Sequence, residues 1–162
     1  MACYNACPVG AIYTGYDENG FETVNIDEDK CIDCKKCTEV CKKRTDVKRN
    51  VAGLCYAAQM NNTAALMKSA SGGAFQALAD SVLEAGGVCY GCFAEIDENG
   101  YGAKHIRIDG RDDLEKILNS KYIPSLVFNA YSLALEDLKA GKTVLFSGTP
   151  CQIEGLYVKK AF

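Results

Sequence analysis

The stretch Cys31-Ile32-Asp33-Cys34-Lys35-Lys36-Cys37-Thr38-Glu39-Val40-Cys41 carries the strongest signal in the chain, with the spacing Cys-x2-Cys-x2-Cys-x3-Cys. Three thiolates at these intervals wrap one iron–sulfur cube from a single tight loop, and the fourth sits a helical turn further on. A structural zinc site is the competing interpretation, but zinc ribbons use two separate Cys-x2-Cys knuckles. The spacing therefore predicts a 4Fe–4S site.

A second, partial copy of the motif opens the chain. Cys3-x3-Cys7-Pro8 matches its tail, including the proline that commonly follows the fourth cysteine. The same number of positions separates Cys3 from Cys37 and Cys7 from Cys41, which indicates a duplicated half. In the crossed ligation of two-cluster ferredoxins, the fourth cysteine of one motif completes the other cluster. The complete 4Fe–4S site is therefore expected to use Cys7, Cys31, Cys34 and Cys37.

The second cluster site is incomplete in this sequence. It would use Cys3, Cys41 and two further cysteines at positions before residue 1, and Lys42 stands where a second Cys-Pro proline is expected. Either the second cluster was lost and Cys3 and Cys41 are relics, or the sequence is a fragment. We favour the fragment.

The composition points to thiol chemistry. The 162 residues include 10 cysteines, one histidine and no tryptophan, with a formal net charge of −3. Such a charge gives no basic field for nucleic acid or an anionic membrane. No secretory signal opens the chain and no long apolar run occurs, so we expect a cytoplasmic protein without membrane insertion. In that reducing setting, many cysteines indicate metal binding or redox work.

Charge divides the chain into three parts. Residues 1–41 carry a net charge of −5, and residues 42–50 carry +4. We interpret the basic stretch as a solvated linker, with an anion or partner contact as the alternative. The predicted domains are a ferredoxin-type module with its basic connector over 1–49 and a larger domain over 50–162.

Hydrophobic periodicity and turn residues predict a mixture of helices and strands. Asn-Gly pairs indicate hairpins, Gly86-Gly87 and Gly141 end two helices, and Thr149 with Pro150 begins a last one. The fold class is thus α+β or α/β, a small iron–sulfur module followed by part of a layered domain with a mixed sheet. The expected elements are hairpins within 11–26 and 88–108, helices within 71–86, 112–118 and 127–138, a strand at 143–146 and a helix from 150.

The remaining cysteines and the histidine carry weaker signals. Cys151 would lie in the first turn of a helix, where a thiolate is favoured, so a cluster ligand or cofactor neighbour and a buried inert cysteine are both open. Cys89 and Cys92 lie in a strand-like run and are interpreted as packing residues rather than a redox pair. Cys55 is also expected to pack, and His105 receives no role.

Three segments in order resemble one family. Residues 71–91, 120–122 and 145–153 are similar in sequence and spacing to the coenzyme F-420 hydrogenase/dehydrogenase beta-subunit family. The preceding module resembles the form of that family found in many anaerobic bacteria. Family members continue past the Gly-Thr-Pro-Cys motif into a region with further cysteines. The chain is therefore expected to be cut at both ends, and Cys151 to lack its co-ligands.

The resemblance implies an iron–sulfur flavoprotein oxidoreductase. Clusters would relay electrons to a flavin, usually FAD, which exchanges a hydride with a deazaflavin or another two-electron acceptor. The expected partner is a ferredoxin or a hydrogenase or dehydrogenase subunit. The alternatives are a ferredoxin-type carrier or docking module without catalysis of its own, and an inactive truncated product. The resemblance places Ser71, Gly72, Gly73, Ser120, Lys121, Tyr122, Gly148 and Thr149 at the cofactor and makes Cys151 a cluster ligand.

Overall fold

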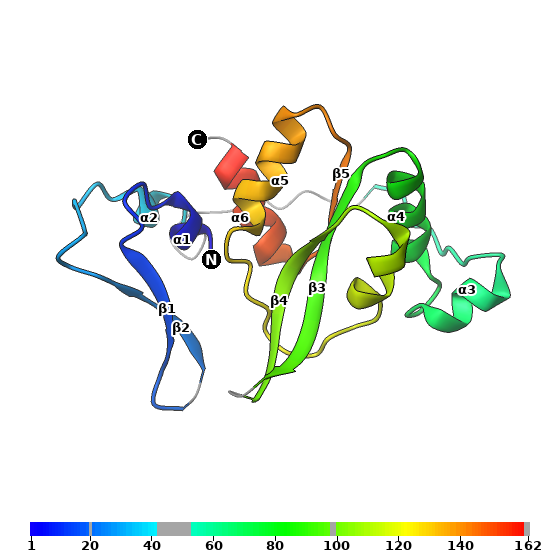
Figure 1. Cartoon of the computed structure of the whole chain (residues 1–162), viewed down its shortest axis with the longest axis horizontal. Helices are drawn as coiled ribbons and strands as arrows, with labels where there is room; N and C mark the ends of the chain where they lie inside the picture. Colours follow the sequence, from blue (N-terminus) through cyan, green and yellow to red (C-terminus); the bar gives the residue numbers. More distant parts are fainter. Residues whose placement is uncertain (20, 42–52, 98–99, 161–162) are drawn as a thin grey trace. The chain divides into compact units, whose positions relative to one another are not determined.

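The computed structural model describes residues 1–19, 21–41, 53–97 and 100–160 (Figure 1). The chain divides into two compact units, Met1–Lys48 with Thr149–Phe162, and Arg49–Gly148. The predicted boundary at residue 49 and the basic stretch fall among residues 42–52, outside the described part. Within the described residues, none of the helices is both long enough and apolar enough to cross a membrane.

The first unit is built on a short antiparallel hairpin. Strands β1 and β2 pair with Ile12 opposite Ile26 and Tyr16 opposite Glu22, as predicted from the turn between them (Figure 1). The Asp17 carboxylate accepts the backbone N–H groups of Asn19 and Phe21, both at 2.9 Å, and so closes the turn. The elements of this unit are α1 (Ala2–Ala6), β1 (Ile12–Tyr16), β2 (Glu22–Ile26), α2 (Lys36–Glu39) and α6 (Pro150–Lys160).

The second unit contains a mixed sheet with the strand order β4-β3-β5. Strand β3 pairs antiparallel with β4 and parallel with β5. Together with the helices, this arrangement is an α+β fold. The elements are α3 (Thr63–Lys68), α4 (Ala74–Glu84), β3 (Val88–Asp97), β4 (Gly100–Ile108), η2 (Arg111–Ile117), α5 (Ala130–Lys139) and β5 (Val144–Phe146).

Alternation along β3 forms both halves of the core. Cys89 is fully buried in a cluster with Ala79 of α4 and Ile117 of η2. Its neighbour Tyr90 points to the opposite face, as expected for successive residues of a strand, and contacts α5. Gly91 leaves room for η2, because a Cβ there would lie 2.9 Å from the Ile117 Cβ.

Three sequence expectations are corrected in this unit. Cys55 is exposed rather than packed, because its stretch forms no regular element and the flanking Leu54 and Tyr56 are over 80% exposed. The helix expected from Val127 begins at Ala130, since the preceding residues instead pair Leu126 with Lys104 in an isolated β-bridge. The expected helix at 112–118 is a 3-10 helix, η2. Cys89, by contrast, is buried as predicted, and burial raises the pKa of its thiol to about 11.

His105 has a structural place that its sequence neighbours did not reveal. It lies on β4, is only 7% exposed and stacks on Phe146 with ring centroids 5.3 Å apart. Its Nε2 lies 2.9 Å from the Ser147 carbonyl oxygen, which only accepts, so Nε2 carries the proton. Nδ1 lies 3.1 Å from the Ser125 hydroxyl. Burial lowers the pKa of this imidazole, which holds it neutral.

A buried carboxylate joins β3, β4 and α5. Asp137 of α5 accepts hydrogen bonds from the Tyr90 hydroxyl at 2.6 Å and from Arg107 Nε at 2.7 Å, and Lys142 Nζ lies at 2.9 Å. The Arg107 guanidinium is the main reason that the pKa of Asp137 is held well below its usual range. The ionised carboxylate is thus part of the folded state.

We predict that Asp137→Asn lowers the free energy of unfolding by about 2 kcal/mol at pH 7, because it leaves Arg107 without its main counter-charge. A depressed pKa stabilises the fold above the unfolded value near 4, and that contribution is lost as the pH falls below it. The difference between Asp137→Asn and the native chain should therefore shrink toward pH 2. Urea titrations followed by circular dichroism measure it, and a difference independent of pH would contradict the assignment.

Candidate metal centre

Two residues in the left-handed region shape the loop that carries three of the predicted ligands. Asp33 and Lys35 have φ of 50° and 59°, and they flank Cys34. For residues other than glycine this conformation is rare and costs at least about 1 kcal/mol each. The loop passes into α2, which bears Cys37. The backbone around Cys34 thus follows a course that its own residue types do not favour, which is typical of functional sites.

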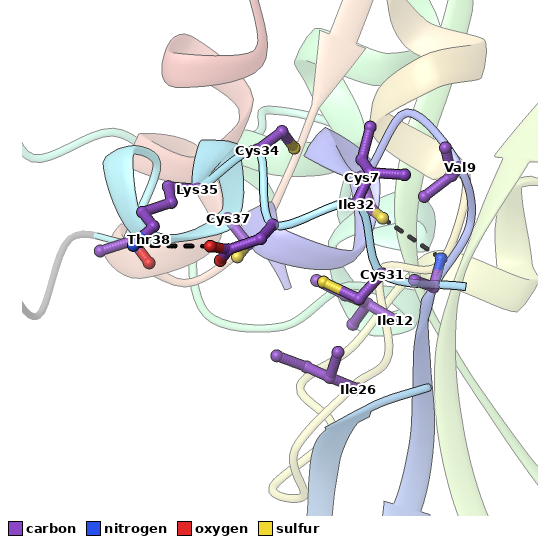
Figure 2. Close-up of a pocket in the computed structure, with 12 residues that line it drawn as sticks. Cys7, Val9, Ile12, Ile26, Cys31, Ile32, Cys34, Lys35, Cys37 and Thr38 are labelled. Atoms are coloured by element: carbon purple, nitrogen blue, oxygen red, sulfur yellow. Dashed lines mark hydrogen bonds and ion pairs between the residues drawn. The ribbon is translucent and has the colours of Figure 1, made fainter. Parts of the chain in front are cut away.

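Cys7 reaches the same region from the end of α1. The turn that follows it uses a positive φ of 62° at Gly10 and returns the Ala11 N–H toward the Cys7 Sγ, to which it donates at 3.2 Å (Figure 2). Burial alone raises the pKa of the Cys7 thiol, but the backbone N–H groups of Val9, Ala11, Ile12 and Gly10 outweigh it. The pKa of Cys7 is therefore lowered. The turn favours the thiolate, which is the form that ligates metals.

The four thiols of the predicted complete site surround one pocket of about 220 Å³ (Figure 2). Two come from sequence positions far apart, since Cys7 follows α1 and Cys31 follows the hairpin. An apolar wall around thiolates limits water access and tunes a redox centre. The pocket is lined by Cys7, Cys31, Cys34 and Cys37 together with Val9, Ala11, Ile12, Ile26, Ile32, Asp33, Lys35 and Thr38.

A zinc ion and a 4Fe–4S cluster can both be bound by four thiolates, but they differ in how far apart the sulfurs lie. Among the described residues, no three His, Cys, Asp or Glu side chains are placed to hold one metal ion. A zinc site needs its ligands to converge within about 2.3 Å of one point. A 4Fe–4S cluster instead offers four irons, so its thiolates are spread around a larger body. The four thiols line one pocket, and their spacing in the sequence is the observation that favours the cluster.

The other predicted ligands do not join this pocket. Cys3 of α1 and Cys41 after α2 are half-buried and are not among its lining residues. Cys151 is exposed in the first turn of α6, with its Sγ 3.1 Å from the Thr149 hydroxyl. The Gln152 side chain accepts the Thr149 N–H at 2.8 Å, a helix start of the capping-box kind.

At two of the glycines expected to contact flavin, the space that a side chain would need is already filled by other residues of the second unit. A Cβ on Gly72 would lie 2.2 Å from the Ala58 carbonyl oxygen, and one on Gly73 would lie 2.5 Å from the Met60 Sδ. The close approach of the segment 58–60 thus explains why both positions hold glycine. Gly73 also requires its positive φ of 74° to begin α4. A contact of Ser71, Gly72 or Gly73 with flavin stays a prediction.

In the segment 120–122, the Lys121 side chain is likewise hydrogen-bonded within the second unit, to backbone carbonyl oxygens. Lys121 Nζ donates to the carbonyl oxygens of Lys116, Leu118 and Asn119 at the end of η2. Burial lowers the pKa of this ammonium group. Tyr122 is 93% exposed. The roles of Ser120, Lys121, Tyr122, Gly148 and Thr149 toward a cofactor also stay predictions.

The comparison with protein families supports the metal chemistry. Residues 1–45 match the family described as 4Fe-4S dicluster domain. The match covers all six cysteines of the first module and ends before the second unit. No curated protein matches the chain. A ferredoxin-type domain at the N-terminus is thus shown, and with it an iron–sulfur character for this part of the chain.

We predict that Cys34→Ser removes most of the visible iron–sulfur absorption, because an alkoxide is a poor substitute for a thiolate on iron. Cys92→Ser is the matched control, since Cys92 lies on β3 and is not among the residues that line this pocket. Absorption near 400 nm and iron content of anaerobically purified protein measure both. Equal loss in the two variants would contradict the ligand assignment.

A second substitution tests the glycine contact. Gly72→Ala should destabilise the second unit by about 2 kcal/mol or more, because the new methyl meets a backbone oxygen that cannot rotate away. The effect is expected in protein prepared without flavin. Gly53→Ala is the control, since a Cβ at Gly53 meets nothing within 4 Å. Equal midpoints in thermal unfolding for Gly72→Ala and the native chain would show that the segment 58–60 moves to make room for the methyl group, and would contradict the prediction.

Proposed function

We propose that the chain is the electron-transfer part of an iron–sulfur oxidoreductase, in which Cys7, Cys31, Cys34 and Cys37 hold one 4Fe–4S cluster. The observation that carries this proposal is that these four thiols line one pocket. When bound, such a cluster supplies one-electron oxidation and reduction at low potential. The match of residues 1–45 to the dicluster domain supports the same chemistry.

The chain's own residues prepare the pocket in two ways. Backbone N–H groups around Cys7 donate toward its sulfur, which stabilises negative charge on that ligand and shifts a redox centre toward easier reduction. The side chains of Val9, Ile12 and Ile32 line the pocket beside the sulfurs and give it apolar walls. The lysine ammonium of Lys35 adds a positive charge at the rim.

We further propose that residues 50–162 belong to a flavin-linked enzyme of the coenzyme F-420 hydrogenase/dehydrogenase beta-subunit type. The support is the resemblance of residues 71–91, 120–122 and 145–153 to that family. A flavin would accept single electrons and deliver a hydride to a deazaflavin or another two-electron acceptor. Cys151, exposed at the start of α6, is available as a ligand for a further cluster in this proposal.

A carrier without catalysis of its own is the second candidate. It is favoured by the contacts that already fill the space at Gly72 and Gly73, because these glycines then need no flavin to explain them. In this case the first unit relays electrons and the second unit docks or positions it. The two candidates differ in one measurable component, the flavin.

Chemical analysis of anaerobically purified protein separates the candidates. The cluster proposal predicts about four irons and four acid-labile sulfides per chain for one 4Fe–4S cluster. Flavin released by denaturation in equal amount to the chain would support the enzyme. Iron and sulfide without flavin, also after incubation with FAD, would support the carrier. Zinc without sulfide would contradict both.

A further inference from the structure

One face of the hairpin in the first unit is apolar and continues from the thiol pocket. Residues directly opposite in an antiparallel pair share a face, so Ile12 with Ile26, Thr14 with Val24, and Tyr16 lie on the same side. We call these five residues the hairpin face. Ile12 and Ile26 also line the pocket of the four thiols, so the face begins at the candidate cluster (Figure 2).

Most of the hairpin face is open to solvent. Tyr16 is 68% exposed, Ile26 50% and Val24 42%, whereas Ile12 is buried against the pocket. Adjacent exposed apolar side chains on a small module are typical of an interaction surface. An aromatic and two aliphatic side chains are the kind of group that forms the centre of a protein contact.

The surroundings of the hairpin face are acidic. The first 41 residues hold eight acids and three bases. Two of the three lysines already face acids, Lys30 with Asp27 at 2.7 Å and Lys35 with Asp33 at 3.7 Å. The exposed carboxylates of Glu18, at the hairpin turn, and of Glu28 and Asp29, after β2, frame the two ends of the face.

We infer that the hairpin face is the docking surface for a redox partner protein whose own contact face has an apolar centre ringed by lysine and arginine. Opposite charges steer encounter and fix orientation, and the apolar side chains supply the short-range contact. Docking there brings the partner to the side of the pocket walled by Ile12 and Ile26. Electron transfer falls steeply with distance, so a contact that continues from the pocket favours it. The inference rests on the proposed function.

The experiment uses cytochrome c, a small basic redox protein, as the probe. Tyr16→Thr combined with Val24→Thr removes apolar surface from the hairpin face, keeps residues that favour strands and changes no charge. Tyr13→Thr is the matched control, because Tyr13 is 53% exposed on the opposite face of the same strand. Calorimetric binding of cytochrome c is measured first, then its reduction by the dithionite-reduced chain under anaerobic conditions.

We expect the double variant to bind cytochrome c about tenfold more weakly than the native chain, and Tyr13→Thr to bind within about twofold of it. Reduction of cytochrome c at limiting concentration should fall in parallel, while reduction of menadione, a small neutral acceptor that needs no docking, stays unchanged. Glu18→Gln with Glu28→Gln and Asp29→Asn should slow association and flatten its dependence on salt.

Equal binding of the double variant and the native chain would overturn the inference. Binding is read without electron transfer, so a chain that lacks iron and sulfide would contradict the proposed function and still report on docking.

Discussion

The turn between α1 and β1 is the constraint on which the candidate metal centre depends. It begins at Cys7, reverses at Gly10 and delivers the Ala11 N–H to the cysteine sulfur at 3.2 Å. The same turn aligns Ile12 at the start of β1, so one short segment orients a ligand and an apolar wall of the pocket. If Cys7 pointed elsewhere, the loop at 31–37 would hold three thiols without a fourth.

The polar groups of the two units have different hydrogen-bond partners. In the first unit, backbone N–H groups face a sulfur at the edge of an open pocket. In the second, the Asp137 carboxylate accepts hydrogen bonds from a tyrosine, an arginine and a lysine. The His105 ring lies within hydrogen-bond distance of Ser125 and Ser147. The second pattern stabilises a packed sheet, because buried polar and charged groups are tolerated only with partners. The first pattern instead favours the thiolate at Cys7, the form that a metal ligand needs.

Local signals predicted much of this fold because they act over a few residues. The cysteine spacing indicated an iron–sulfur module, Asn-Gly indicated both hairpins, and Thr149 with Pro150 marked the start of α6. The errors arose where distant partners decide. Leu126 pairs with Lys104 and thereby delays α5, and Cys55 has apolar neighbours in sequence but none that cover it in the fold.

In the candidate site, too, the local motif was predictable from the sequence, and contacts between distant segments were not. That Cys7 would join Cys31, Cys34 and Cys37 follows from a duplicated motif, and all four line one pocket. The contact of Gly72 with Ala58 could not be predicted from the sequence, because no residue pattern in 58–60 indicates that this segment packs against Gly72. The same holds for His105 and Ser147, which lie 42 positions apart.

The assignment of residues 149–162 to the first unit has a consequence for synthesis. A ribosome releases the cysteine-bearing loop before the second unit, and α6 after it. Domains generally fold as units in the order of their synthesis. Here α6 belongs to the first unit but follows the second unit in the sequence, so the cysteine-bearing loop is made before its last described helix, while the sheet of the second unit is already able to form.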